Sequence, residues 1–112
     1  MRLSPALEAS LEVYRRLLEA RFGSRLRALR LFGSQARGDS DAESDADVSV
    51  VINELTDDER AEVIDLAFDA WCQAGCAGPL ISPLPWSEHD EAARRAAGRR
   101  LALDIVREGL PL

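Results

Sequence analysis

Residues 31–52, "LFGSQARGDSDAESDADVSVVI", hold the pattern that decides the fold. The stretch begins with an apolar pair and Gly33-Ser34, continues through many acidic residues and ends in a β-branched run at residues 48–52. A run rich in valine and isoleucine is typical of a buried, central strand. The acidic residues between the two apolar segments either solvate a loop or include two carboxylates held in place for a cation.

Helix and strand patterns continue on both sides of this stretch. Upstream, residues 5–23 carry apolar side chains at spacings of three and four, which predicts a helix, and residues 25–32 alternate as a strand. Downstream, the capping-box sequence "TDDE" at residues 56–59 predicts the start of a helix that ends near Gly75.

The remaining chain predicts one more strand and a final helix. Residues 79–86, "PLISPLPW", are apolar, but their prolines confine this strand to a sheet edge or make it irregular. The sequence "SEHD" at residues 87–90 is a helix start, and the helix is expected to end before Gly109. The predicted buried stripes of the last two helices are Ile64, Ala67, Phe68 and Trp71, and Ala93, Ala97, Leu101 and Ile105.

The predicted order of elements is therefore α-β-β-α-β-α. This order corresponds to an α/β (α+β) fold with a small mixed β-sheet of about three to four strands flanked by helices. With 112 residues the chain suffices for one modest core, so residues 1–112 are expected to form a single domain. The longest uncharged stretch is interrupted by glycine and proline, and the N-terminus has no apolar signal core. These features predict a cytoplasmic protein without a membrane span.

Charge and cysteine content narrow the function classes. The net charge of -6 argues against a general nucleic-acid-binding protein, because such proteins usually have a basic face. The arginine-rich segment 94–100, "RRAAGRR", is interpreted as a solvated helix face, with a partner-binding patch as the alternative. Cys72, Cys76 and the single histidine His89 are too few for a zinc site, and both cysteines are expected to be buried near a helix end.

Two other motifs fail in the acidic stretch. A phosphate-binding P-loop requires lysine where Asp39 stands, and an anion there would repel phosphates. A calcium loop requires glycine at its sixth position and glutamate at its twelfth, where this chain has Ser44 and Val50. The stretch is therefore interpreted as neither of these loops.

Asp45 and Asp47 support a different interpretation. Side chains two positions apart in a strand point to the same face, so both carboxylates are expected to emerge together. Like charges at that distance repel unless a cation lies between them, and Mg²⁺ binds carboxylates together with nucleotide phosphates. Gly33 and Ser34, where the first strand ends, offer backbone N–H groups and a hydroxyl to phosphate. The arrangement predicts a site for a magnesium–nucleoside triphosphate complex.

The spacing of these residues resembles that of a known family. Gly33-Ser34, ten intervening residues and Asp45-Ala46-Asp47 reproduce the Gly-Ser-x10-Asp-x-Asp signature of the polymerase-β-like nucleotidyltransferases. Arg37-Gly38 and Ser44 also match the core sequence of that family. Over essentially its whole length the chain resembles a minimal nucleotidyltransferase (MNT) domain, which implies the polymerase-β-like nucleotidyltransferase fold.

The resemblance implies an activity and the residues that perform it. Family members use Mg²⁺ to transfer a nucleoside monophosphate, here expected to be AMP from ATP, to a hydroxyl group with loss of pyrophosphate. The implied catalytic and metal-binding residues are Asp45 and Asp47, and the implied phosphate-binding residues are Gly33, Ser34 and Arg37. For Arg37 the alternative is exposure to solvent or a salt bridge to the loop acids Asp39, Asp41 or Glu43, which are themselves expected to be solvated.

One departure from the family leaves two functions open. Active members usually carry a third carboxylate on the next core strand, where this chain has Ser82. The first expectation is an enzyme that modifies a hydroxyl on a protein partner, and the resemblance suggests the antitoxin of a pair whose toxin is a helical HEPN-like protein. The alternative is a weak or inactive MNT fold that acts by binding, as an antitoxin or regulatory subunit. Because the added domain of larger relatives is missing, self-association to a homo-oligomer or a second protein is expected to close the cleft.

Overall fold

The computed structural model describes residues 3–38 and 44–112. The main helices and strands follow the predicted order, and further short elements lie between them. In chain order the elements are α1 (Pro5–Phe22), a 3₁₀ turn (Gly23–Arg25), β1 (Leu26–Phe32), α2 (Gly33–Arg37), β2 (Ala46–Ile52), α3 (Asp57–Gln73), β3 (Ile81–Ser87), α4 (Glu88–Ala96), α5 (Arg100–Glu108) and β4 (Leu110–Pro111).

The strands of the described chain form one mixed sheet in the order β3-β2-β1-β4. β1 pairs antiparallel with β2 and with β4, and β3 pairs parallel with β2. The predicted mixed sheet flanked by helices is therefore confirmed, and β3 lies at a sheet edge as its prolines indicate. Pro83 and Pro85 suit an edge because proline cannot donate a backbone hydrogen bond to a further strand.

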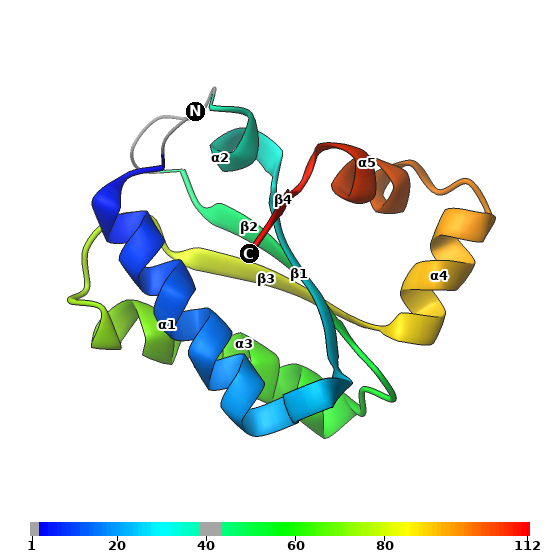
Figure 1. Ribbon diagram of the computed structural model, residues 1–112, viewed down its shortest axis with the longest axis horizontal. Coiled ribbons are helices and arrows are strands. Elements are labelled where there is room, and N and C mark those ends of the chain that lie inside the picture. The colour runs from blue at the N-terminus through cyan, green and yellow to red at the C-terminus, as the bar shows by residue number, and fades with distance from the viewer. Residues whose placement is uncertain (1–2, 39–43) are drawn as a thin grey trace.

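Helices cover both faces of the sheet (Figure 1). α1 and α3 pack on one face, and α4 and α5 lie over the other. Side chains alternate along β2, so Val48 and Val50 join the larger core with α1 and α3, whereas Val51 joins a smaller core with α5. By the same alternation Asp47 belongs to the face of the smaller core. The predicted site residue therefore lies on the α4–α5 side of the sheet.

Side-chain caps explain where the helices begin. Ser4 accepts a hydrogen bond from the Leu7 N–H at 3.2 Å, which caps α1. Thr56 and Glu59 exchange hydrogen bonds in the capping box of α3. Ser87 caps α4 in the same way as Ser4 caps α1. These helix starts agree with the sequence prediction.

The buried face of α3 differs from the predicted one. Val63, Ala67 and Ala70 are buried, whereas Ile64 is 48% and Phe68 58% exposed. The prediction that Ile64, Phe68 and Trp71 line the inner face is therefore wrong, and of that stripe only Ala67 is buried. The buried stripe is displaced by one residue, which corresponds to a rotation of about 100° on an α-helix.

The predicted final helix is divided into α4 and α5. Gly98 adopts a left-handed conformation, with φ of 74°, just after the end of α4, and the chain turns before α5 begins. The single stripe expected over both helices is consequently wrong, except that Ile105 is buried as predicted. Ala93, Ala97 and Leu101 are exposed, and the buried residues of the two helices are Glu91, Ala102 and Ile105.

The cysteines and the arginine-rich segment lie on the surface. Cys72 and Cys76 are both exposed, so the expectation that they are buried is wrong. Cys72 is exposed because the face of α3 that packs on the sheet consists of Val63, Ala67 and Ala70, and Cys72 does not belong to that face. The four arginines of residues 94–100 are exposed, as interpreted from the sequence.

In the part of the chain that the structure describes, none of the helices combines the length and the hydropathy that crossing a lipid bilayer requires.

Candidate functional site

Gly33 lies at the junction of β1 and α2, beside the start of β2. Its φ of 75° is a left-handed backbone conformation that glycine adopts at little cost. A Cβ atom at this position would lie 2.7 Å from Oδ2 of Asp47, too close for a non-bonded contact. The sheet register explains the proximity, because Phe32 and Asp47 are paired across β1 and β2. Both the backbone conformation and the adjoining carboxylate therefore favour glycine at residue 33.

The two predicted carboxylates interact electrostatically. Asp45 is exposed and precedes β2, Asp47 is half-buried within that strand, and Ala46 between them is fully buried in the larger core. Partial burial raises the pKa of the Asp47 carboxyl above its ordinary value, and the negative charge of Asp45 raises it further. Neither aspartate forms an ion pair with another described residue. The structure therefore brings Asp45 and Asp47 close together at the start of β2.

Two hydrogen bonds hold the segment that leads into β2. The Nε2 group of Gln35 in α2 donates to the Ser44 carbonyl at 2.8 Å. The Ala46 N–H donates to the Leu80 carbonyl, also at 2.8 Å, which ties the segment to the beginning of β3. Sequence reasoning did not include Gln35, because a glutamine on a short helix has no signal of its own. Its contact shows that α2 fixes the residue just before Asp45.

β3 brings a hydroxyl group beside Asp47. Ser82 is paired with Asp47 in the parallel register of β2 and β3, and residues paired in this way point to the same face. Ser82 is exposed, and the strand Ile81–Ser87 contains neither aspartate nor glutamate. The strand next to Asp47 therefore offers a neutral oxygen and no third carboxylate.

Arg37 ends α2 and is exposed. It lines the same hollow as Gly33, so it belongs to the surroundings of the Gly33-Ser34 turn. The loop acids Asp39, Asp41 and Glu43 lie outside the described residues. Whether Arg37 contacts a phosphate or one of these acids stays a prediction.

A hollow of about 200 Å³ separates α2 from α5 beside the Gly33-Ser34 turn. Its walls include Gly33 from one side and Ile105, Asp104 and Glu108 of α5 from the other. Sequence reasoning missed these two acids. Their spacing of four residues on a helix indicates a shared face, but only the fold shows that this face lies toward Gly33. Asp104 and Glu108 therefore add negative charge near the Gly33-Ser34 turn.

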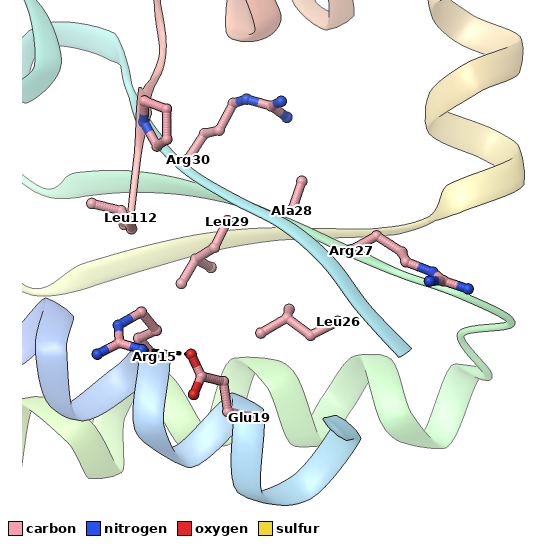
Figure 2. Close-up of a pocket in the computed structure, with 9 residues that line it drawn as sticks. Arg15, Glu19, Leu26, Arg27, Ala28, Leu29, Arg30 and Leu112 are labelled. Atoms are coloured by element: carbon pink, nitrogen blue, oxygen red, sulfur yellow. Dashed lines mark hydrogen bonds and ion pairs between the residues drawn. The ribbon is translucent and has the colours of Figure 1, made fainter. Parts of the chain in front are cut away.

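A second hollow, of about 300 Å³, lies along the edge of β1 (Figure 2). Arg30 points to one side of the strand, and Leu29 points to the other, toward α1. On that side Arg15 and Glu19 form an ion pair at 2.6 Å. Its lining includes none of the predicted site residues, so this hollow is separate from the candidate site.

The available donors suit a divalent cation that is bound together with phosphates. Within residues 3–38 and 44–112, no group of three or more His, Cys, Asp or Glu side chains is arranged to hold a metal ion. Mg²⁺ commonly takes one or two protein carboxylates and completes its shell with phosphate oxygens and water. Asp45 and Asp47 fit that requirement, because they are neighbouring carboxylates whose charges repel. Ser82 adds only a neutral oxygen.

Comparison with known proteins gives one family match and one solved structure of low sequence identity. A search of curated proteins gives no significant match. A solved structure from Sulfolobus solfataricus, named a "putative nucleotidyltransferase", aligns with 98% of this chain and 87% of its own at 15% identity and a TM-score of 0.44. A family model described as "Nucleotidyltransferase domain" matches residues 11–73, which is more than half of the chain and contains Gly33, Ser34, Asp45 and Asp47. The chain therefore belongs to the nucleotidyltransferase domain family.

Proposed function

We propose that this chain transfers a nucleoside monophosphate, AMP from ATP, to a hydroxyl group on a protein partner, with Mg²⁺ as cofactor. The observation that carries the proposal is the proximity of Gly33 and Asp47, because it places the N-terminus of α2 next to a carboxylate of β2. A triphosphate requires both elements. Backbone N–H groups bind its oxygen atoms, and carboxylates bind the accompanying cation.

Each candidate residue has a separate role in the proposal. Gly33 and Ser34 bind the β- and γ-phosphates through backbone N–H groups and the serine hydroxyl, and Arg37 offsets phosphate charge. Asp45 and Asp47 are the metal ligands and hence the catalytic residues. The raised pKa of Asp47 supports this assignment, because a cation between two carboxylates removes the repulsion that contributes to the shift.

The proposed reaction is a displacement at the α-phosphorus of ATP. The acceptor oxygen forms a bond to phosphorus, the bond to pyrophosphate breaks, and the hydroxyl proton passes to solvent or to a basic group. Asp45 and Asp47 would hold Mg²⁺, which when bound would offset the charge that develops on the phosphoryl oxygens. Ser82, paired with Asp47, is a poor proton acceptor because its hydroxyl is neutral. We therefore expect slow transfer unless the acceptor protein contributes a base.

The same serine favours a second candidate function, in which the chain binds its partner without modifying it. The resemblance to MNT proteins implies an antitoxin whose partner is a HEPN-like toxin. In the first candidate the antitoxin adenylylates a hydroxyl of the toxin. In the second it neutralises the toxin by contact alone, and nucleotide binding is at most regulatory.

Label transfer tests the first candidate. The purified chain is incubated with Mg²⁺, the proposed HEPN-like partner protein, and ATP that carries radioactive phosphorus at either the α- or the γ-position. We expect label from the α-position on the acceptor protein, no label from the γ-position, and loss of transfer in the presence of a chelator. Asp45→Asn and Asp47→Asn should each lower transfer by about a hundredfold or more, because each removes a metal ligand.

The control variant is Glu8→Gln, which changes an exposed acid on α1 and should transfer at the wild-type rate. Equal labelling by wild type and both aspartate variants would refute the proposed roles of Asp45 and Asp47. If neither the wild type nor the variants transfer label to the acceptor, but both aspartate variants still neutralise the toxin in cells, the second candidate function replaces the first.

A further inference from the structure

Two exposed apolar side chains of α3, Ile64 and Phe68, together with the half-buried Trp71 form an apolar ridge along the helix. Ile64 and Phe68, one turn apart, are 48% and 58% exposed. The rings of Phe68 and Trp71 lie side by side with centroids 6.0 Å apart. Trp71 Nε1 donates to the Gly78 carbonyl at 3.1 Å, which holds the indole against the following loop. Single exposed apolar residues are ordinary, but contiguous exposed apolar groups mark an interaction surface.

This ridge, defined as Ile64, Phe68 and Trp71, lies on the side of α3 that is nearest β3. Arg60, one turn before Ile64, donates a hydrogen bond to the Pro85 carbonyl of β3. On the other side of the helix Glu62 pairs with Arg21 of α1 at 2.6 Å. The exposure of Ile64 and Phe68 shows that no other part of the described chain covers these two side chains.

α3 therefore has two apolar stripes, of which the fold uses one. Val63, Ala67 and Ala70 face the sheet and are at most 1% exposed. A surface helix that packs only on its own sheet needs a single apolar stripe and is polar elsewhere. The second stripe carries the largest side chains of the helix, so it adds exposed apolar area without adding to the core.

The ridge has an acidic border. Asp65 and Asp69 follow Ile64 and Phe68 in sequence, are exposed, and form no ion pair with a described residue. Arg60 is the sole basic residue of α3, and it is directed toward β3. An apolar stripe with a negative border is complementary to a helix that has an apolar stripe with a positive border.

We propose that the α3 ridge is a docking surface for a basic amphipathic helix of a partner protein. A second copy of this chain is the competing occupant, because α4 and α5 border a basic and apolar groove of about 480 Å³. The helices that border this groove, α4 and α5, lie on the opposite face of the sheet from α3 (Figure 1). Contact between them would repeat from copy to copy, which builds open chains unless the rotation happens to close a ring. A different protein fits the surface without that consequence.

The docking surface is independent of the proposed nucleotide transfer. The ridge belongs to the α1–α3 layer, whereas Asp47 lies on the α4–α5 side of the sheet. A result at the ridge therefore neither supports nor weakens the roles of Asp45 and Asp47.

Designed peptides test the proposal without knowledge of the natural partner. One peptide of about 18 residues has leucine at helical spacing and lysine on the borders of that stripe, and a matched peptide has glutamate in place of lysine. Binding to the full chain is measured by calorimetry and by Trp71 emission, with buried Trp86 as a constant background. We expect the lysine peptide to bind in the micromolar range and the glutamate peptide to bind at least about tenfold more weakly.

Variants locate the binding. Phe68→Ser should weaken binding of the lysine peptide by about tenfold, and the double change Asp65→Asn, Asp69→Asn by several-fold with a reduced dependence on salt. The control is Val106→Ser, which alters an apolar residue of α5 that is 41% exposed on the other face. Equal affinity of the two peptides, or unchanged binding in Phe68→Ser, overturns the proposal. So does self-association of the wild-type chain, seen by sedimentation, that Phe68→Ser abolishes.

Discussion

At the scale of single residues, a substitution at Gly33 allows two effects to be measured separately, the cost of the left-handed backbone and the displacement of the Asp47 carboxylate. The Asp47 carboxylate is the flexible end of its side chain, so a methyl group at residue 33 would displace the carboxylate before it displaces the backbone. The Asp47 carboxylate, which is the proposed metal ligand, should then change position while the fold persists. Gly98 has the same left-handed conformation without such a neighbour.

Gly33→Ala and Gly98→Ala are a matched pair for this purpose. Their φ angles are 75° and 74°, but an added Cβ meets Asp47 at residue 33 and open space at residue 98. We expect both variants to lose about 1–2 kcal/mol of unfolding free energy, the ordinary cost of a left-handed non-glycine residue. Only Gly33→Ala should also lose affinity for Mg²⁺–ATP in calorimetry. Wild-type affinity in Gly33→Ala would show that the Gly33–Asp47 contact has no part in binding.

Asp47 should make stability depend on pH in a defined direction. Its folded-state pKa is raised by partial burial and by Asp45, so the folded chain holds this proton more tightly than the unfolded chain does. The stabilisation that comes from the protonated Asp47 carboxyl is therefore fully present below its ordinary pKa of 3.8. It is lost as the pH rises through the raised pKa of the folded chain. Asp47→Asn has no carboxyl to ionise, so the variant does not lose stability at this residue as the pH rises.

The expected result is that Asp47→Asn is slightly more stable than wild type at about pH 7, by no more than about 0.5 kcal/mol at a partly exposed position. The two proteins should have equal stability at about pH 3, where the wild-type carboxyl is protonated. Urea unfolding at both pH values measures the difference. A variant that is less stable at neutral pH would mean that the Asp47 charge stabilises the fold.

At the scale of elements, local rules predict where helices and strands begin but not which face of a helix is buried. The caps Ser4, Thr56 and Ser87 and the alternation of the strands act within a few residues, so the sequence contains them completely. The orientation of α3 depends on the sheet below it. Both of its apolar stripes satisfy the same periodicity, and the stripe with the larger side chains is the exposed one.

The candidate site divides in the same way. The proximity of Asp47 to Gly33 and to Asp45 could be predicted because a turn and a strand lie within one β-α-β segment, whereas the binding roles of these residues and of Ser34 stay predictions. Gln35 and the α5 acids Asp104 and Glu108 could not be predicted, because their positions follow from α2 reaching Ser44 and from the break at Gly98 that sets the direction of α5. Contacts that depend on a tertiary turn leave no periodic trace in the sequence.

A buried hydrogen bond between strands gives a prediction at this scale. Trp86 of β3 donates from Nε1 to the Ser49 hydroxyl of β2 at 2.9 Å, and both residues are buried. Ser49→Ala should lower the unfolding free energy by about 1–3 kcal/mol, because it leaves the indole N–H without a partner. Urea unfolding measures the loss.

The control uses the same substitution at another buried serine. Ser10 donates its hydroxyl to the Leu7 carbonyl within α1. Ser10→Ala removes the donor, leaves no N–H unpaired and improves helix propensity, so its cost should stay below about 1 kcal/mol. If both variants lose the same stability, the Trp86 N–H does not explain the effect of Ser49.

At the scale of the whole molecule, the two layers are held to the sheet by cores of unequal size. Among the described residues the core on the α1–α3 side contains fifteen buried residues, and the core on the α4–α5 side contains four. The proposed site lies on the side with the smaller core. α5 also carries Asp104 and Glu108, which line the hollow beside Gly33. Movement of this layer would therefore change the surroundings of the site while the rest of the fold persists.

Hydrogen exchange should show that α4 and α5 open separately from the rest of the chain. Local stability follows the number of buried apolar contacts, so amides of α4 and α5 are expected to exchange faster than those of α1, α3 and β2. Ile105→Ala removes one of the few buried side chains of that layer, a change that costs about 2–5 kcal/mol in a well-packed core. It should abolish protection in α5 and leave protection in α1 unchanged. Leu101→Ala, at a position 52% exposed on the same helix, should change neither. Equal loss of protection in α1 and α5 would mean that the two layers unfold as one unit, and access to the site could then not be controlled by α5 alone.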